Sequence, residues 1–191
     1  MNRAVFLDRD GVINAAIYNP VEGKLDSPYR LEDFRLLPGA AQAIRLINSL
    51  DLLAVVVSNQ PGVAKGKCNS AFLDALDQRL HWELARQGAH LDAIYYCLHH
   101  PQAQLESLRL SCDCRKPKPG LLLRAARELA IDLARSYMVG DSPTDVAAGL
   151  AAGCQTILLN NADDRPVNGQ RPHFVAVDLA AAVRVIAEGR R

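Results

Sequence analysis

The sequence has little excess charge of either sign, because 22 lysine and arginine residues face 21 aspartate and glutamate residues, for a net charge of +1. We therefore expect no nucleic-acid partner. It also lacks an apolar run that could cross a membrane and an N-terminal apolar segment of signal-peptide length, so we expect a cytoplasmic protein with no membrane partner. In that compartment the five cysteines are expected as metal ligands, catalytic groups or core residues rather than as disulfides.

Repeats and low-complexity tracts are absent as well, and 191 residues that are 49% hydrophobic suffice for one domain, 1–191, with a full core. Short apolar runs alternate with segments of helical period. This alternation predicts an α/β fold with a doubly wound, mostly parallel sheet. The predicted strands cover 4–7, 52–57, 92–97, 136–139, 156–159 and 174–177; the predicted helices cover 38–50, 70–87 (capped by Ser70), 120–130, 146–152 and a last segment from 179.

The segment from Val5 to Asn14 carries the first candidate site. Its apolar run predicts a strand buried on both faces, and Asp8, Asp10 and Gly11 follow this strand directly. Ligands of open α/β sheets bind at the carboxyl ends of the strands, and a glycine lets the backbone come close to a ligand. An acidic turn is the alternative, and only residues later in the chain favour a site over a turn. The polar segment 14–37 that follows is expected to be an irregular loop, functional or mobile.

Polar side chains also follow two later strands. Ser58, Asn59 and Gln60 come after the second predicted strand and Asp141 after the fourth, while Lys116 precedes a predicted helix. Carboxylates at one rim suit Mg²⁺, which takes oxygen ligands and retains water or phosphate oxygens. A lysine offers compact positive charge to phosphate, one carboxylate can attack phosphorus, and a neighbouring carboxyl can donate and accept a proton. The set predicts Mg²⁺-dependent phosphoryl transfer.

A long loop after the third strand holds a second candidate metal site. Its four candidate ligands are Cys97, His99, Cys112 and Cys114. Three sulfurs and one imidazole form a common closed tetrahedral zinc site, so we expect a structural Zn²⁺ that fixes the segment 97–119. The alternative is two buried thiols and an unrelated pair, since the spacings are tighter than in usual zinc motifs. Cys68 and Cys154 have no partner pattern and are expected as small core residues.

Four of these motifs, in this order along the chain, resemble those of phosphatases of the haloacid dehalogenase (HAD) superfamily: Asp8-x-Asp10-Gly11, Ser58, Lys116 and Gly140-Asp141-x-x-x-Asp145. The resemblance implies a HAD-like Rossmannoid fold with Asp8 as nucleophile and Asp10 as general acid and base. Ser58 and Lys116 are then expected to hold the phosphoryl group. Asp8, the Asp10 backbone and Asp141 are expected to bind Mg²⁺, with Asp145 orienting the site. The chain has no room for the large cap domain of many relatives.

Further segments resemble the D-glycero-D-manno-heptose-1,7-bisphosphate 7-phosphatase family of this superfamily, namely Asp8 to Asn14, Ser58 to Gln60, Tyr95 to Pro101 and Cys112 to Gly120. This implies hydrolysis of a small phosphorylated sugar through an aspartyl-phosphate, in ADP-heptose and lipopolysaccharide biosynthesis. The implied substrate contacts are Arg9, Ala16, Ile17, Tyr18, Asn19, Asn59, Gln60 and Arg115. We expect a monomer. Histidinol phosphate or another sugar phosphate is the alternative substrate, and a non-catalytic, zinc-stabilised binding protein is the alternative class.

Overall fold

A parallel sheet of six strands forms the centre of the molecule, as seen in the computed structural model, which describes residues 1–20, 22–159 and 171–189. Its strands are β1 (Ala4–Leu7), β4 (Leu53–Asn59), β5 (Ala93–Cys97), β6 (Tyr137–Gly140), β7 (Gln155–Leu159) and β8 (Phe174–Ala176). They lie in the order β5-β4-β1-β6-β7-β8, and every neighbouring pair is parallel. The predicted doubly wound α/β fold is confirmed.

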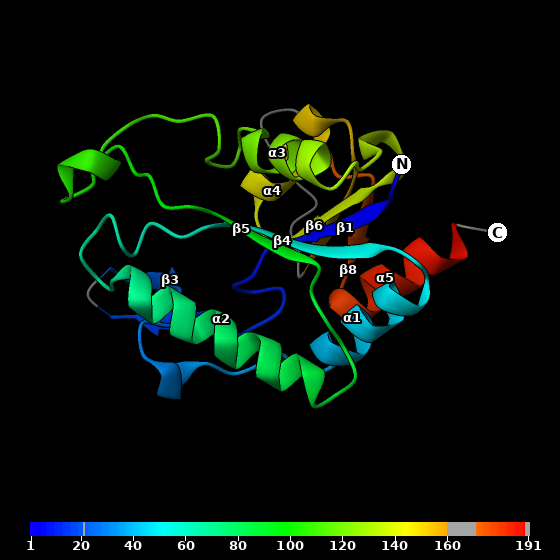
Figure 1. Ribbon diagram of the computed structural model, residues 1–191, viewed down its shortest axis with the longest axis horizontal. Coiled ribbons are helices and arrows are strands. Elements are labelled where there is room, and N and C mark those ends of the chain that lie inside the picture. Colours follow the sequence, from blue (N-terminus) through cyan, green and yellow to red (C-terminus); the bar gives the residue numbers. More distant parts are fainter. Residues whose placement is uncertain (21, 160–170, 190–191) are drawn as a thin grey trace.

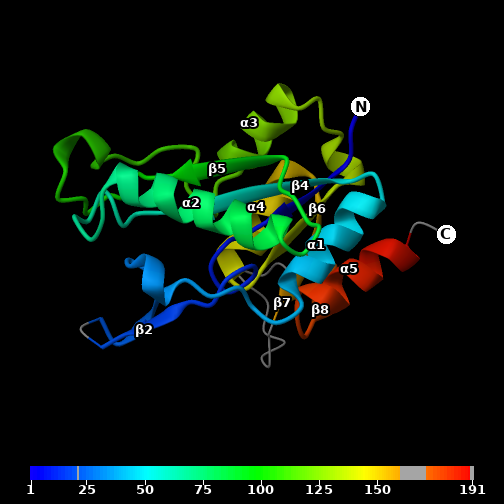
Figure 2. The ribbon, with the colours of Figure 1, turned by 60° about the horizontal axis from the view of Figure 1, so that its bottom comes forward.

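Helices cover both faces of this sheet. They are α1 (Ala40–Ser49), α2 (Ser70–Ala85), α3 (Gly120–Glu128), α4 (Pro143–Ala152) and α5 (Leu179–Glu188). One apolar core lies beneath α1, α2 and α5, and the other beneath α3 and α4, as Figures 1 and 2 show. In β1 the side chains alternate between these cores, Val5 and Leu7 on one side and Phe6 on the other. Because β1 is buried on both faces, all of its residues are apolar, which is the pattern that predicted this strand.

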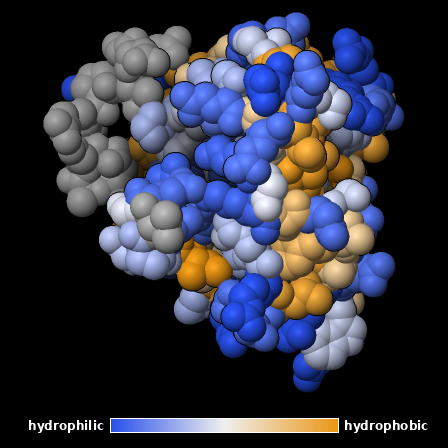
Figure 3. Space-filling view, turned by 90° about the vertical axis from the view of Figure 1, so that its left-hand side faces the viewer, coloured by the Kyte–Doolittle hydropathy of each residue, from blue (hydrophilic) through white to orange (hydrophobic). Residues whose placement is uncertain are grey.

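The carboxyl ends of the parallel strands share one edge of the sheet, on the left in Figure 1. Asp8 follows β1, Asp141 follows β6, and Ser58 and Asn59 end β4. Figure 3 looks onto this side of the molecule, where hydrophilic side chains occupy much of the centre and an apolar area lies beside them. The topology therefore brings the predicted polar residues to one place.

Several element boundaries differ from prediction by one to three residues, and one helix cap differs as well. The second strand continues to Asn59 because Ser58 and Asn59 still pair with Tyr96 and Cys97 of β5, although their side chains are polar. Helix α4 begins at Pro143, a residue whose missing N–H is harmless in a first helical turn. Helix α2 is capped by the side chain of Asn69, which accepts a hydrogen bond from the N–H of Phe72, and not by Ser70.

The segment 14–37 is more regular than predicted. It contains an antiparallel hairpin of β2 (Ile17–Asn19) and β3 (Lys24–Asp26), followed by a 3-10 turn at Leu31–Asp33; residue 21, at its tip, lies outside the described residues. Strands of three residues are too short for an alternating pattern to reveal them. This hairpin and the long loop that contains a turn at Glu106–Leu108 flank the carboxyl edge, where no large cap domain is found in the described chain.

Helices of the length and apolarity needed to traverse a bilayer were not found in the part of the chain that the structure describes.

Candidate active site

Lys116 ties the centre of the site together. Its ammonium lies 3.0 Å from Asp8 Oδ1 and 2.5 Å from Asp145 Oδ1, and it donates to the carbonyl of Val57 at 2.9 Å. Burial opposes the charge of Lys116, but the two carboxylates outweigh it, so the pKa lies above its usual value and the side chain stays cationic. Asp145 is itself fixed by Ser142, whose N–H and hydroxyl donate to Asp145 Oδ2. Asp145, fully buried, thus pairs with Lys116 from inside the protein.

Asp8 and Asp141 form a cluster suited to a divalent cation. Carboxylate oxygens of Asp8, Asp141 and Asp145 all lie within 4.8 Å of one another. Burial raises the pKa of Asp8 to about 6, with the opposing charge of Lys116 only partly offsetting it. Burial and the charge of Asp8 raise the pKa of Asp141 to about 7. Negative charge is thus in excess here, which is the condition that a hard cation with oxygen ligands relieves, and the donor set fits Mg²⁺.

A glycine is required at position 11 because the backbone there passes close to the carboxylate of Asp141. Its φ of +82° lies in the left-handed region, and a Cβ at this position would collide with the carboxylate of Asp141. The glycine after Asp10 therefore lets the end of β1 pass directly beside Asp141.

Asp10 accepts hydrogen bonds from several directions. Asn14 donates to Asp10 Oδ1 at 2.8 Å and Gln60 donates to Oδ2 at 2.7 Å. The guanidinium of Arg9 forms an ion pair with Oδ2 at 3.0 Å. Burial by itself would raise the pKa of Asp10, but the charge of Arg9 and these hydrogen bonds hold it below the usual value. Arg9 is fully buried and also donates to the hydroxyl of Tyr96 at 3.1 Å.

The end of β4 contributes two different contacts. Ser58, almost fully buried, gives Asp8 a hydrogen bond that lowers its pKa. Asn59 pairs with the backbone of Lys116: its amide donates to the Lys116 carbonyl and its oxygen accepts from the Lys116 N–H, both at 3.0 Å. Asn59 thus connects the central sheet to the loop that delivers Lys116.

We expect Asn59→Ala to lower kcat about tenfold or more, because two hydrogen bonds that place Lys116, each worth about 1 kcal/mol, are lost. Asn48→Ala is the matched control, since Asn48 makes the same pair of bonds to the backbone of His90, at 3.2 and 3.1 Å, away from the site. Steady-state kinetics and thermal melting of both variants measure the difference. Equal losses of activity would show that Asn59 matters only for stability.

One pocket of about 240 Å³ collects most of the predicted site. Seven predicted residues line it: Asp8, Asp10, Ala16, Ser58, Asn59, Arg115 and Asp141. Ile17, Tyr18 and Asn19 line a neighbouring pocket on the hairpin instead. Arg9 and Gln60, expected as substrate contacts, are buried and bound to Asp10 and to each other, with 2.8 Å between Arg9 Nη2 and Gln60 Oε1.

The sequence did not identify the residues that hold the hairpin against the site. Asp26 and Ser27 line the pocket, and Ser27 Oγ lies 2.8 Å from Asp10 Oδ2. Lys67 reaches Asp26 at 2.5 Å and also contacts Glu22, which fastens the hairpin to the segment after β4. The hairpin residues and Lys67 are distant in the sequence and form no motif, so no sequence pattern predicts that they contact one another.

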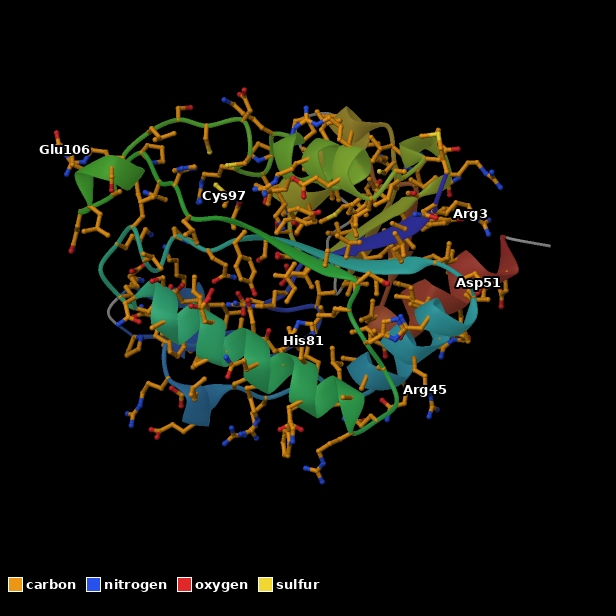
Figure 4. All side chains as sticks on the ribbon, in the orientation of Figure 1. Arg3, Arg45, Asp51, His81, Cys97 and Glu106 are labelled. Carbon is orange, nitrogen blue, oxygen red and sulfur yellow. The ribbon has the colours of Figure 1, made fainter. Side chains whose placement is uncertain are left out.

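The cysteine loop brings its four predicted ligands together. Figure 4 shows Cys97 where β5 enters the loop and Glu106 at the far tip of that loop. The sulfurs of Cys97, Cys112 and Cys114 lie 3.1–3.5 Å apart, and His99 Nδ1 lies 3.3 Å from the Cys114 sulfur. A tetrahedral Zn²⁺ with bonds of 2.3 Å to sulfur requires ligand separations of about 3.7 Å, so the set fits zinc.

The electrostatics of the loop agree with this fit. Burial alone would raise the pKa of the Cys112 thiol, but hydrogen bonds from Cys114, Cys97 and His99 lower it to about 7, which favours the thiolate that binds metal. Outside the cluster, Cys154 is buried in the core as predicted, whereas Cys68 is only half-buried.

The chain is similar to a family of hydrolases and, within it, to named phosphatases. The family model described as HAD-hydrolase-like matches residues 113–182. D-glycero-beta-D-manno-heptose-1,7-bisphosphate 7-phosphatase of Escherichia coli (strain K12) is 43% identical over 158 residues, 82% of this chain and 78% of the relative. The Haemophilus influenzae protein of the same name is 38% identical over 172 residues, 89% of this chain and 87% of the relative.

Among solved structures, D,D-heptose 1,7-bisphosphate phosphatase from B. bronchiseptica, complexed with magnesium and phosphate, superimposes with a TM-score of 0.80 at 32% identity, covering 98% of this chain and 99% of the other. The chain belongs to the HAD superfamily of phosphoric monoester hydrolases, in the family of these heptose bisphosphate phosphatases.

Proposed function

We propose that this protein is a Mg²⁺-dependent phosphatase that removes the 7-phosphate of D-glycero-D-manno-heptose 1,7-bisphosphate. The observation that carries the proposal is the position of Asp8, a carboxylate on the pocket wall that touches the ammonium of Lys116 and lies beside Asp141. A nucleophile, a phosphate-neutralising cation and a metal site thus meet at one point. The names of the relatives support the substrate.

In the proposed first step, an Asp8 oxygen attacks phosphorus as the bond from phosphorus to the sugar oxygen breaks, and the protonated form of Asp10 donates its proton to that leaving oxygen. In the second step, Asp10 accepts a proton from water, whose oxygen attacks phosphorus and releases inorganic phosphate from Asp8. Ser58 and Lys116 hold the phosphoryl oxygens throughout. Mg²⁺ held by Asp8 and Asp141 supplies positive charge that offsets the charge of the transferring group.

Arg115 favours a doubly phosphorylated substrate over histidinol phosphate, because it is a cation on the wall of the pocket. A second phosphate can pair with its guanidinium, whereas the amine of histidinol cannot. ADP-heptose and lipopolysaccharide biosynthesis is the corresponding pathway.

The test is phosphate release from heptose 1,7-bisphosphate, a heptose monophosphate and histidinol phosphate, with and without Mg²⁺. We expect the highest kcat/KM for the bisphosphate and no turnover without Mg²⁺. Arg115→Ala should raise the KM for the bisphosphate about tenfold, the effect of losing one charged contact on the pocket wall, and change the KM for the monophosphate little. Lys118→Ala, exposed and paired with Asp113, is the control. If no phosphate is released from any of these substrates, the result would favour a non-catalytic binding protein.

Several further properties belong to the same proposal. Zn²⁺ in the Cys97 cluster is structural, because four protein ligands leave no position for substrate. The chain works as a single domain, 1–191, and as a monomer in the cytoplasm, with a sugar phosphate as its partner and no nucleic-acid or membrane partner.

A further inference from the structure

Ser27 connects the hairpin to Asp10. The Ser27 hydroxyl donates to Asp10 Oδ2 at 2.8 Å, and Gln60 Oε1 lies 3.3 Å from the same hydroxyl. Ser27 follows β3 directly, so this contact joins the small two-stranded sheet to the end of β1. The proposed function assigns no task to Ser27.

The position of Ser27 differs from that of the other groups that donate to Asp10. Arg9 and Asn14 are fully buried, Gln60 is 2% exposed, and all three approach Asp10 from inside the protein. Ser27 is half-buried and lines the pocket together with Asp10. Among these described donors, Ser27 is therefore the one that contacts Asp10 Oδ2 from the pocket side, opposite the buried guanidinium of Arg9.

Ser27 is itself held firmly. Asp26 Oδ1 accepts hydrogen bonds from the Ser27 N–H at 2.9 Å and from the Tyr29 hydroxyl at 2.7 Å, and Lys67 pairs with the other oxygen. Pro28, the next residue, is buried. A hydroxyl fixed in this way can hold a carboxyl in one orientation, which a mobile side chain cannot.

We infer that Ser27 is a positioning residue that keeps the Asp10 carboxyl turned toward the pocket, where it transfers a proton to the leaving oxygen. The inference rests on the proposed function, in which Asp10 is the acid. In the step concerned, the proton leaves Asp10 for the oxygen as that oxygen separates from phosphorus, and Asp10 becomes a carboxylate. A leaving group that is stable as an anion needs no such proton.

The leaving group provides the test. Ser27→Ala and Ser49→Ala are assayed with a sugar phosphate and with p-nitrophenyl phosphate; Ser49 is an exposed hydroxyl at the end of α1 and serves as the control. We expect Ser27→Ala to lower kcat for the sugar phosphate about tenfold, a part of the 10²–10⁴-fold that a positioned acid contributes. The kcat/KM for p-nitrophenyl phosphate, which reports the first step and not the later attack of water, and the KM for the sugar phosphate should change less than about twofold, and Ser49→Ala should match wild type.

A double-mutant comparison gives a second readout. In an Asp10→Asn background Ser27→Ala should cause no further loss on the sugar phosphate, because the group that Ser27 positions is gone. Equal losses of kcat/KM on both substrates, a change in KM alone, a gain in kcat, or additive losses in the double variant would overturn the inference. An absence of turnover in the wild type on every substrate would instead overturn the proposed function itself.

Discussion

Asp8→Asn is expected to abolish phosphatase activity while the protein stays folded. An amide has nearly the shape of the carboxylate but cannot attack phosphorus, so kcat should fall by at least about 10⁴-fold on every substrate, as for other covalent nucleophiles. Because Asp8 carries a raised pKa, loss of its charge also relieves repulsion with Asp141 and Asp145. The melting temperature should therefore not fall by more than a few degrees, and activity and melting are measured on the same preparation.

Asp74→Asn is the matched control, because Asp74 is an exposed acid on α2 far along the chain from the strand ends. It should keep full activity. Turnover by Asp8→Asn above a hundredth of the wild-type rate would assign the nucleophile to another group, and Asp10, the other carboxylate on the pocket wall beside β1, is the first to examine.

Removal of zinc is expected to have the second large effect. Structural zinc sites bind with about 10–16 kcal/mol, which is as large as the whole stability of a typical domain, so the segment 97–119 should lose its fold. Activity should be lost with it, since Arg115 and Lys116 follow Cys114 directly. Chelation, or Cys112→Ser, should lower the melting temperature by at least about 10 °C and open the loop to proteolysis.

The comparison variant for zinc removal is Cys68→Ser, which changes a half-buried thiol outside the cluster. It should retain bound zinc, measured by elemental analysis, and wild-type activity. Metal-free protein with unchanged melting and activity would mean that the four ligands are held by packing alone and that the loop needs no ion.

The sequence predicts best what the sheet controls. Because parallel strands expose their carboxyl ends at one edge, the polar residues at the ends of β1, β4 and β6 predict that Asp8, Ser58 and Asp141 lie together, and all three line one pocket. The cysteine and histidine spacing identified the second cluster in the same way. In both cases the residue type limits the possible role: carboxylates suit a hard cation, and thiolates with an imidazole suit zinc.

Contacts between segments that are distant in the chain are not predictable from the amino-acid sequence. Asn59 was expected to touch the substrate, but its side chain bonds the Lys116 backbone in a loop 57 residues away. Arg9 was expected to contact the substrate, and Asp10, Gln60 and Tyr96 provide enough partners to bury its guanidinium completely. Such outcomes depend on the three-dimensional arrangement of partners, which a local pattern does not contain.

The hairpin of β2 and β3 stands outside the main sheet, and a Cβ added at Gly23 would meet no atom within 4 Å. Lys67 and Ser27 fasten the hairpin to the body of the protein. Ile17 and Tyr18, which line the neighbouring pocket, can therefore be replaced without removing a contact to Asp10. A designer who wants to vary this appendage should diversify these two positions first and leave Asp26, Ser27 and the strand ends unchanged.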